Sequence, residues 1–508
     1  MSEDPSEPAA QFTDRARGTD LRAHALKLPG VLMQALTHIA PAVGMVAFIP
    51  MITSFSGVTS PLAYLIAFVI VATLGISLTQ LAKHLPSAGG YYTYVSRTVS
   101  PRAGFLTAWT LFIIELIAPA AGLGFGGFLF EGAMKAQYGF TFPWWLFLLI
   151  GAAIIFAVSY FGIRIAVGLA VLLSALEILI VLALSISSLA SPGPGGVTLA
   201  PFNPTNSIST NGLFLAVVFT IFAFAGFESV APLAEESQNP RRTLPRAIMI
   251  SIMVAGAFYV FTGWALLVGW GTSDIPAFTS SADNPVFTLA TRLWGDAWII
   301  VLLAVVNSIL AIGIAATNAG TRVVYAMARS GSLPSWLARV HDRYQTPVNT
   351  IYFQTALTLV VGLGLGFWVG PASFFFTIGL AVTLSLMFFY IAGNLGVFLY
   401  YTRSRRNEFN LVLHVLFPLA SSVALVFVGY KSLTPLPPSP TRYGAVVAVV
   451  WLLIGVGVLL VMRRTGREHW LLNAGTVFQD GADREAEEIG GTRSGEVAPP
   501  MAPLSEGG

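Results

Sequence analysis

The sequence predicts an all-α integral membrane protein with about twelve transmembrane helices. Apolar residues make up 55% of the 508-residue chain, charged residues make up only 10%, and the mean hydropathy is +0.75. A soluble protein could not expose this composition to water. Long apolar runs recur along the chain, and the basic residues gather in every second loop between them. These observations predict a helical bundle in a lipid bilayer.

Each apolar run is about 20 residues or longer, the length that a helix needs to cross the hydrocarbon core. A helix is expected because lipid offers the backbone no other hydrogen-bond partner. The predicted spans are residues 31–55, 60–82, 103–130, 142–162, 166–190, 211–235, 246–270, 297–323, 347–368, 372–401, 411–430 and 443–462.

The distribution of Lys and Arg predicts the orientation of these spans. If the N-terminus lies inside, 23 of the 27 basic residues fall in inside segments, and only Lys135, Arg292, Lys431 and Arg442 fall outside. Inside loops of membrane proteins carry this excess of positive charge. We therefore expect a multi-pass protein of the cell membrane with both termini in the cytoplasm.

The two ends of the chain differ from its apolar middle. Residues 1–28 mix acidic and basic residues without the basic-then-apolar order of a cleaved signal, and are expected to form a cytoplasmic tail. Residues 464–508 are polar, Gly-rich and partly acidic, and are expected to be a disordered cytoplasmic tail. Residues 29–463 form the predicted transmembrane domain.

Several functional classes fit the sequence poorly. Without cysteine there can be no disulfide or thiolate metal site. The chain has no G-x-x-x-x-G-K-[ST] or H-E-x-x-H motif, so no catalytic residue, metal or cofactor is predicted. The net charge of +3 follows from the loop asymmetry, and nucleic acid is not an expected partner.

Two predicted spans contain interruptions at matching places. Pro41 and Gly44 follow His38 in the first span, and the sixth contains Phe222 to Glu228 (FAFAGFE). These spans are equivalent if two inverted five-helix repeats cover about 31–190 and 211–401, with extra helices at about 411–462. Paired broken helices indicate a central solute site in secondary transporters. The alternative is that proline and glycine only kink the helices for packing.

Few titratable groups lie well within the spans. Three are acidic, Glu115, Glu177 and Glu228, and a charge there costs about 2.5 to 3.5 kcal/mol on insertion scales. They are candidates for amine recognition, proton carriage or gating, or else for neutral hydrogen bonds between helices. His38 is a candidate for proton linkage, or it caps a carbonyl at the break.

Three long motifs resemble those of the amino acid, polyamine and organocation permease superfamily, and the resemblance covers nearly all of residues 28–462. The branch that includes putrescine importers is the most similar in detail. The motifs are Leu81 to Tyr94 (LAKHLPSAGGYYTY), Phe222 to Glu228 continuing through Glu236 and Arg242, and Arg322 through Arg329 to Val348.

The resemblance implies two inverted five-helix repeats with alternating access to a central site. Ala42, Val43 and Gly44 fall on a first-helix turn whose amides bind the substrate carboxylate in relatives, although Ala42 replaces a glycine there. Phe222 falls on an aromatic lid, and Ala225 and Gly226 fall in the unwound segment. Glu228 is the acidic residue that follows. Glu177 stands where some proton-coupled relatives carry a lysine, and Glu115 lies close to an acidic position of the third helix.

The sequence therefore predicts a secondary transporter of a small solute, with protons as the coupling partner and the bilayer as its environment. An amino acid is the leading candidate, and a polyamine or another organic amine is the alternative. A permease-shaped sensor that binds solute without moving it is the candidate from a different class. Glu228 is the predicted coupling residue, with Glu177 and His38 as further candidates, and Glu115 is assigned to solute binding.

Overall fold

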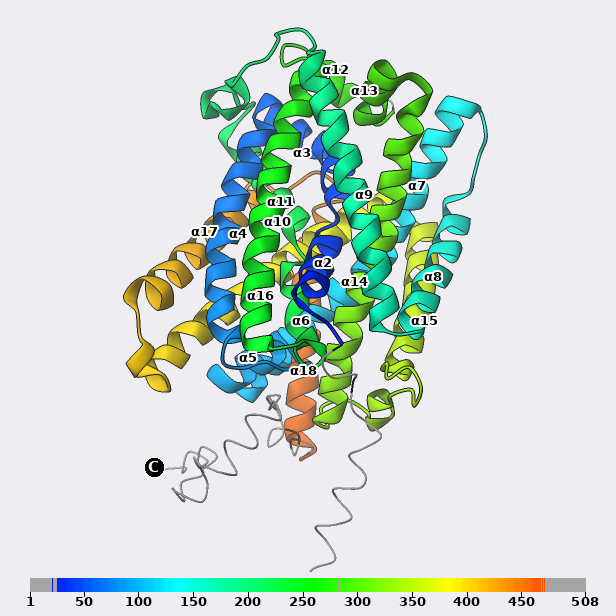
Figure 1. The fold of residues 1–508 in the computed structure, drawn as a ribbon. Helices are drawn as coiled ribbons and strands as arrows, with labels where there is room; N and C mark the ends of the chain where they lie inside the picture. Colours follow the sequence, from blue (N-terminus) through cyan, green and yellow to red (C-terminus); the bar gives the residue numbers. More distant parts are fainter. Residues whose placement is uncertain (1–20, 22–24, 282, 467, 469, 471–508) are drawn as a thin grey trace, which may run out of the picture.

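The structure is a computed structural model that describes residues 21, 25–281, 283–466, 468 and 470, with only the backbone for 163–171. It is a bundle of long helices (Figure 1). In chain order, the helices of the bundle are α2 (Leu28–Ile39), α3 (Ile49–Ser56), α4 (Ser60–Ala82), α6 (Pro101–Phe112), α7 (Ala118–Tyr138), α8 (Trp144–Tyr160), α9 (Ile163–Ala190), α10 (Thr210–Phe224), α11 (Pro240–Trp270), α14 (Ile299–Arg329), α15 (Val348–Val369), α16 (Pro371–Arg403), α17 (Phe417–Leu433) and α18 (Tyr443–Arg464).

The predicted spans agree with these helices. Eleven helical segments of the described chain are long and apolar enough to cross a membrane. The one remaining predicted span, 142–162, corresponds to α8, which is apolar but has only 17 residues. The prediction of an all-α membrane protein with about twelve transmembrane helices is confirmed.

The first span is interrupted directly after α2. Ala40 adopts a left-handed conformation (φ 52°), which few residues other than glycine accept, and its N–H donates to the Leu36 carbonyl. Pro41 then starts the second half, where its lack of an N–H costs nothing because that donor would be unpaired. A π-helical turn, η2 (Val43–Ala47), leads into α3. The break therefore exposes backbone groups in the middle of the bundle.

The sixth span is interrupted between α10 and η7 (Phe227–Glu236), a buried 3₁₀ helix. Ala225 is extended (ψ 139°) and Gly226 has φ 121°. A Cβ at Gly226 would lie 2.7 Å from the backbone carbonyl carbon of His38. Only glycine fits this position, because both its dihedral angle and the close approach of the first span exclude a side chain.

The predicted inside and outside loops lie at opposite ends of the bundle. The short helix α5 (Tyr91–Thr98) lies at the same end as the last residues of α18, and α12 (Ile275–Ser280) and α13 (Pro285–Trp294) lie at the other (Figure 1). At the first end Leu26 pairs with Ser237, and the Leu26 N–H donates to the Glu236 carbonyl at 2.9 Å. Both ends of the described chain therefore reach this face.

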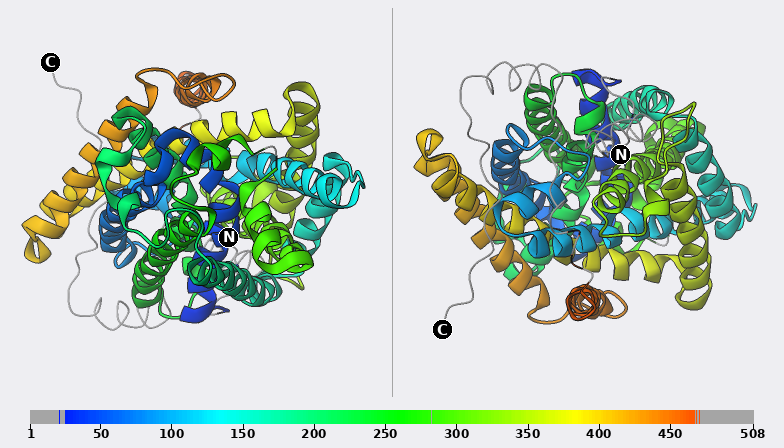
Figure 2. Two further views of the ribbon diagram at one scale, coloured as in Figure 1. Left: turned by 90° about the horizontal axis from the view of Figure 1, so that it is seen from above. Right: turned by 90° about the horizontal axis from the view of Figure 1, so that it is seen from below.

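The two last helices lie at the edge of the bundle (Figure 2). The indole of Trp109 in α6 stacks on that of Trp451 in α18, with ring centres 4.9 Å apart. Each indole N–H donates to the backbone carbonyl of the other tryptophan at 2.8 Å. This reciprocal pair attaches α18 to α6.

Two expectations concern residues beyond the described chain. The predicted N-terminal tail, 1–28, is described only at residue 21 and from residue 25 onward. Most of the predicted C-terminal tail, 464–508, also lies outside the described residues, so its disorder stays a prediction. Of this tail, Glu468 forms a two-pronged ion pair with Arg102 at the start of α6, with N–O distances of 2.8 and 3.1 Å.

Candidate substrate-binding site

A cavity of about 80 Å³ lies where the two breaks meet. Ile39, Ala40 and Gly44 line it from the first span, and Ala223 and Ala225 line it from the sixth. Most of its other lining residues are apolar side chains of α7, α14 and α16. Among the described residues that line it, His38 alone carries a titratable side chain. The cavity therefore combines apolar walls with backbone polar groups, as small-molecule sites commonly do.

Aromatic side chains lie across the cavity on the side of α12 and α13. The Phe222 ring stacks on Phe48 at 5.5 Å, and the Phe375 ring stacks on Phe125 at 4.2 Å. All four residues line the cavity, and Phe48 also contacts Phe375. The predicted lid residue Phe222 is thus one member of a four-ring cluster from four separate elements.

A single hydroxyl joins the two breaks. The Tyr259 hydroxyl in α11 lies 3.0 Å from the carbonyl oxygen of Ile39, where α2 ends, and 3.0 Å from that of Ala223, near the end of α10. A tyrosine hydroxyl has one proton, so it can serve only one of these carbonyls fully at any moment. Tyr64 supports the same region, because its hydroxyl donates to the Gly44 carbonyl at 2.6 Å.

The amides of the first break already have partners. The Val43 N–H donates to the Ser308 hydroxyl at 3.3 Å, and the Gly44 N–H donates to the Ala40 carbonyl at 3.0 Å. The Ala42 N–H faces the carboxyl group of Glu177. These are the three amides that the resemblance assigned to a substrate carboxylate.

Glu177 is completely buried between α9, the first break and α14. Its Oε2 accepts from the Asn307 side-chain amide at 3.2 Å, and the carboxyl group also interacts with the Ser308 hydroxyl and the Ala42 N–H. Its Oε1 has no partner that meets full hydrogen-bond geometry. Glu177 is therefore a buried carboxyl group held by Asn307 of α14 close to the start of the half-helix at Pro41.

A carboxyl group also lies at the second break. The Gly226 N–H donates to Glu228 Oε2 at 3.1 Å, and the carboxyl group interacts with its own backbone N–H and with the Tyr390 hydroxyl. Glu228 Oε1 is buried and has no hydrogen-bond partner. Each interruption thus has one buried glutamate close to its freed amides.

His38 and Glu115 lie together beside the cavity. The His38 Nε2 and Glu115 Oε2 atoms are 3.5 Å apart, and both side chains are buried. Glu115 and Glu228 are close enough to interact electrostatically, and Tyr390 interacts with both. The sequence showed no partner for His38, whereas the structure places it beside one of the three buried acids, Glu115.

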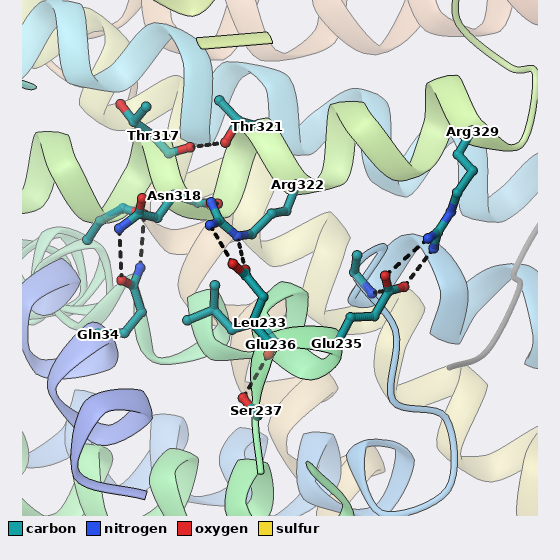
Figure 3. A network of polar contacts seen from close by, with 12 residues as sticks. Gln34, Leu233, Glu235, Glu236, Ser237, Thr317, Asn318, Thr321, Arg322 and Arg329 are labelled. Atoms are coloured by element: carbon teal, nitrogen blue, oxygen red, sulfur yellow. Dashed lines mark hydrogen bonds and ion pairs between the residues drawn. The ribbon is translucent and has the colours of Figure 1, made fainter. Parts of the chain in front are cut away.

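Ion pairs join α14 to the end of η7 (Figure 3). They lie on the opposite side of the cavity from the aromatic rings, because the chain passes from Phe222 through the second break and along η7 to Glu235 and Glu236. Arg322 in α14 makes a two-pronged pair with Glu236 in η7, and these side chains are only 2% and 1% exposed. Arg329 pairs with both oxygens of Glu235 at 2.6 and 3.1 Å. Gln34 of α2 donates to the Ala315 carbonyl at 2.9 Å in the same layer.

Sequence reasoning missed Tyr259 and assigned no role to the ion pairs. Glu236 and Arg322 stand in the quoted motifs, and a charge of each sign at the edge of an apolar span was the available signal. Tyr259 carried no such signal, because a tyrosine within an apolar helix is ordinary.

The amino acid permease family profile matches residues 30–471 of this chain. The chain is 27% identical to the low-affinity putrescine importer PlaP of Escherichia coli (strain K12), over 75% of this chain and 82% of that protein. It is 28% identical to the branched-chain amino acid permease BcaP of Bacillus subtilis (strain 168), over 61% and 69% respectively. It is 27% identical to the serine/threonine exchanger SteT of the same organism, over 59% and 67%. The chain is a multi-pass membrane transporter that belongs to the amino acid permease family.

Proposed function

We propose that this secondary transporter carries a small solute with a protonated amine across the cell membrane, by alternating access to the cavity between the two breaks. The observation that carries the proposal is the meeting of both interrupted helices at one apolar cavity, beside His38 and Glu115. The backbone carbonyls at the ends of α2 and α10 lie there, and the C-terminal end of a helix favours a cation.

The two closures support an alternating mechanism. The aromatic rings of Phe48, Phe125, Phe222 and Phe375 lie on one side of the cavity, and the pairs Glu236–Arg322 and Glu235–Arg329 lie on the other. A carrier must open only one side at a time. Because α14 and η7 meet through the ion pairs, separating those elements would open the cavity toward the face that carries the predicted cytoplasmic loops.

Proton coupling belongs to the same proposal. Glu228 contacts the Gly226 amide at the second break, so a change in its protonation alters a hydrogen bond of the solute site itself. Glu115 is its neighbour on the cavity side, His38 lies beside Glu115, and Glu177 lies close to the first break. We assign coupling to Glu228, with His38 and Glu177 as supporting groups.

Two solute classes meet this description. The family name favours an amino acid, and the likeness to a putrescine importer favours an amine without a carboxylate. Transport by the purified protein in liposomes, measured with a labelled amino acid and a labelled diamine under an inward proton gradient, tests the proposal. Uptake of either solute that depends on the gradient supports it. Binding without uptake would instead indicate a sensor.

A further inference from the structure

The third membrane span contains a single π-helical turn. This turn, η4 (Ile113–Ile117), lies between α6 and α7, and the Ala118 N–H donates to the Ile113 carbonyl five residues before it. Single π turns inside α-helices are frequent at functional sites. One extra residue in a helical turn rotates the side chains by about 100°, so this turn determines where Glu115 points.

The backbone carbonyl of Glu115 receives a hydrogen bond from another helix. In a regular α-helix this carbonyl would accept the N–H of residue 119, but Pro119 has no N–H. The Gln354 side-chain amide of α15 donates to the Glu115 carbonyl at 2.9 Å, and both residues are buried. A side chain of α15 therefore supplies the donor that the proline removes from the turn around Glu115.

Glutamine at position 354 is not explained by packing alone. Only 33% of the most apolar stretch of α15 is buried within the protein, so most of this helix faces away from the bundle. Its buried side includes a row at intervals of four residues, formed by Gln354, Thr358, Gly362 and Gly366. The Oε1 atom of Gln354 is buried and has no hydrogen-bond partner among the described residues. An unpaired buried polar atom costs free energy, which an apolar residue would avoid.

Glu115 is also confined from the side of α14. A Cβ at Gly320 would lie 2.9 Å from the Cβ of Glu115, so the glycine leaves the space that Glu115 occupies. Gly320 thus limits the side chain of Glu115 while Gln354 holds its backbone. In this position the Glu115 Oε2 atom lies 3.5 Å from the His38 Nε2 atom, beside the cavity between the two breaks.

We infer that Gln354 is a positioning residue of the solute site, which holds the π turn so that the Glu115 carboxyl group lies beside His38. No described residue of α15 lines the cavity, so Gln354 acts through Glu115 and not on the solute. This inference rests on the proposed function, in which His38 and Glu115 form the polar side of the cavity. It adds α15 to the elements on which solute binding depends.

The first test observes His38 without any solute. The imidazole nitrogen resonances of isotope-labelled, full-length protein in lipid are recorded by solid-state NMR, and His38→Gln identifies the signals of His38. Glu115→Ala shows where these signals lie when the neighbouring carboxyl group is absent. Gln354→Met keeps an unbranched side chain of similar length but has no N–H donor. We expect it to move the His38 signals toward their positions in Glu115→Ala. Wild-type signals in folded Gln354→Met would overturn the inference.

Two further variants complete this test. Gln354→Asn keeps an amide that ends one methylene short of the Glu115 carbonyl, so its His38 signals should move as in Gln354→Met. Thr358→Val is the matched control, because it removes a hydroxyl from the same buried row one turn further along α15. It should leave the His38 signals unchanged. If both Gln354 variants failed to fold while Thr358→Val folded, Gln354 would serve stability alone and the inference would be overturned.

The second test measures transport of labelled leucine and labelled putrescine into liposomes. Gln354→Met and Glu115→Ala should each raise KM roughly tenfold, the effect of about one hydrogen bond to a charged group, with a smaller change in kcat. The double variant should be no weaker than Glu115→Ala alone, because both changes remove the same interaction. Losses that multiply in the double variant would overturn the inference. Absence of uptake by the wild type would refute the proposed function only, since the NMR test needs no transport.

Discussion

At the scale of single residues, the site depends on a few atoms that hold the two breaks together. The Gly226 backbone lies against His38, and the Tyr259 hydroxyl bridges Ile39 and Ala223. Glu228 accepts the Gly226 N–H at the second break, and Glu177 lies close to the first break. Four of these residues, His38, Tyr259, Glu177 and Glu228, carry polar side chains in an otherwise apolar region. Their positions rather than their number determine what can bind, because each satisfies a specific backbone group.

Gly226→Ala is predicted to abolish uptake. The added Cβ would lie 2.7 Å from a backbone atom of His38 and would sit at a φ of 121°, a combination that costs roughly 1 to 3 kcal/mol in backbone strain alone. The measurement is solute uptake at equal amounts of protein in the membrane. Gly364→Ala is the control, because a Cβ at that helical glycine has nothing within 4 Å. Normal uptake by Gly226→Ala would show that the close approach of the two spans is dispensable.

Glu228→Gln is predicted to flatten the pH dependence of uptake while solute exchange continues. Glutamine resembles the protonated acid, so it keeps an oxygen acceptor for the Gly226 N–H but can no longer release or take up a proton. Uptake and exchange are measured from about pH 5 to about pH 8, the range in which an unperturbed histidine changes charge. A wild-type pH profile in this variant would remove Glu228 as the coupling residue and direct attention to His38 or Glu177.

At the scale of elements, an interrupted helix provides backbone carbonyl and amide groups that a continuous helix would use in its own hydrogen bonds. The half-helices α2 and α10 end at the cavity with their carbonyls, and η2 and η7 begin there with their amides. On the far side of η7 the chain turns to the ion pairs with α14, so one short 3₁₀ helix links the solute site to the inner closure. Movement of η7 would therefore affect both.

The ion pair Glu236–Arg322 is predicted to hold η7 against α14 and so to close the inner side of the cavity. Arg322→Glu alone should strongly reduce folded protein, because an unpaired buried charge costs about 3 to 5 kcal/mol. Combining it with Glu236→Arg restores opposite charges, so abundance should recover in part. Both variants are compared by fluorescence-detected size exclusion and by uptake. If the double variant were no more abundant than the single one, the direct pairing would not be what holds these elements together.

At the scale of the whole molecule, the sequence predicted the bundle far better than it predicted the site. The twelve spans were readable because a bilayer imposes one length and one composition on every crossing helix. The breaks were readable from Pro41 and Gly226, since these residues affect the backbone locally. The contacts of Glu177 with the first break, and of Tyr259 with both breaks, join residues more than 30 positions apart. No local pattern encodes such contacts.

The absence of cysteine makes the predicted orientation directly testable. Ser191→Cys lies in the exposed loop after α9, and Ser404→Cys lies in the exposed turn after α16. The charge asymmetry predicts that a membrane-impermeant thiol reagent labels intact cells only at the first position. The second position should react only after the cells are permeabilised. The reverse pattern would invert the orientation.

The reciprocal tryptophan pair has a consequence for how the bundle moves in lipid. Only 11% of the most apolar stretch of α18 is buried within the protein, and this helix packs on α16 and on α6, where Trp109 and Trp451 add two hydrogen bonds. In hydrocarbon an indole N–H that leaves its partner finds no water to replace it. Sliding α18 along α6 would break both bonds together, since each tryptophan is donor and acceptor at once. We therefore expect α18 to keep its position relative to α6 when the cavity opens to either side of the membrane.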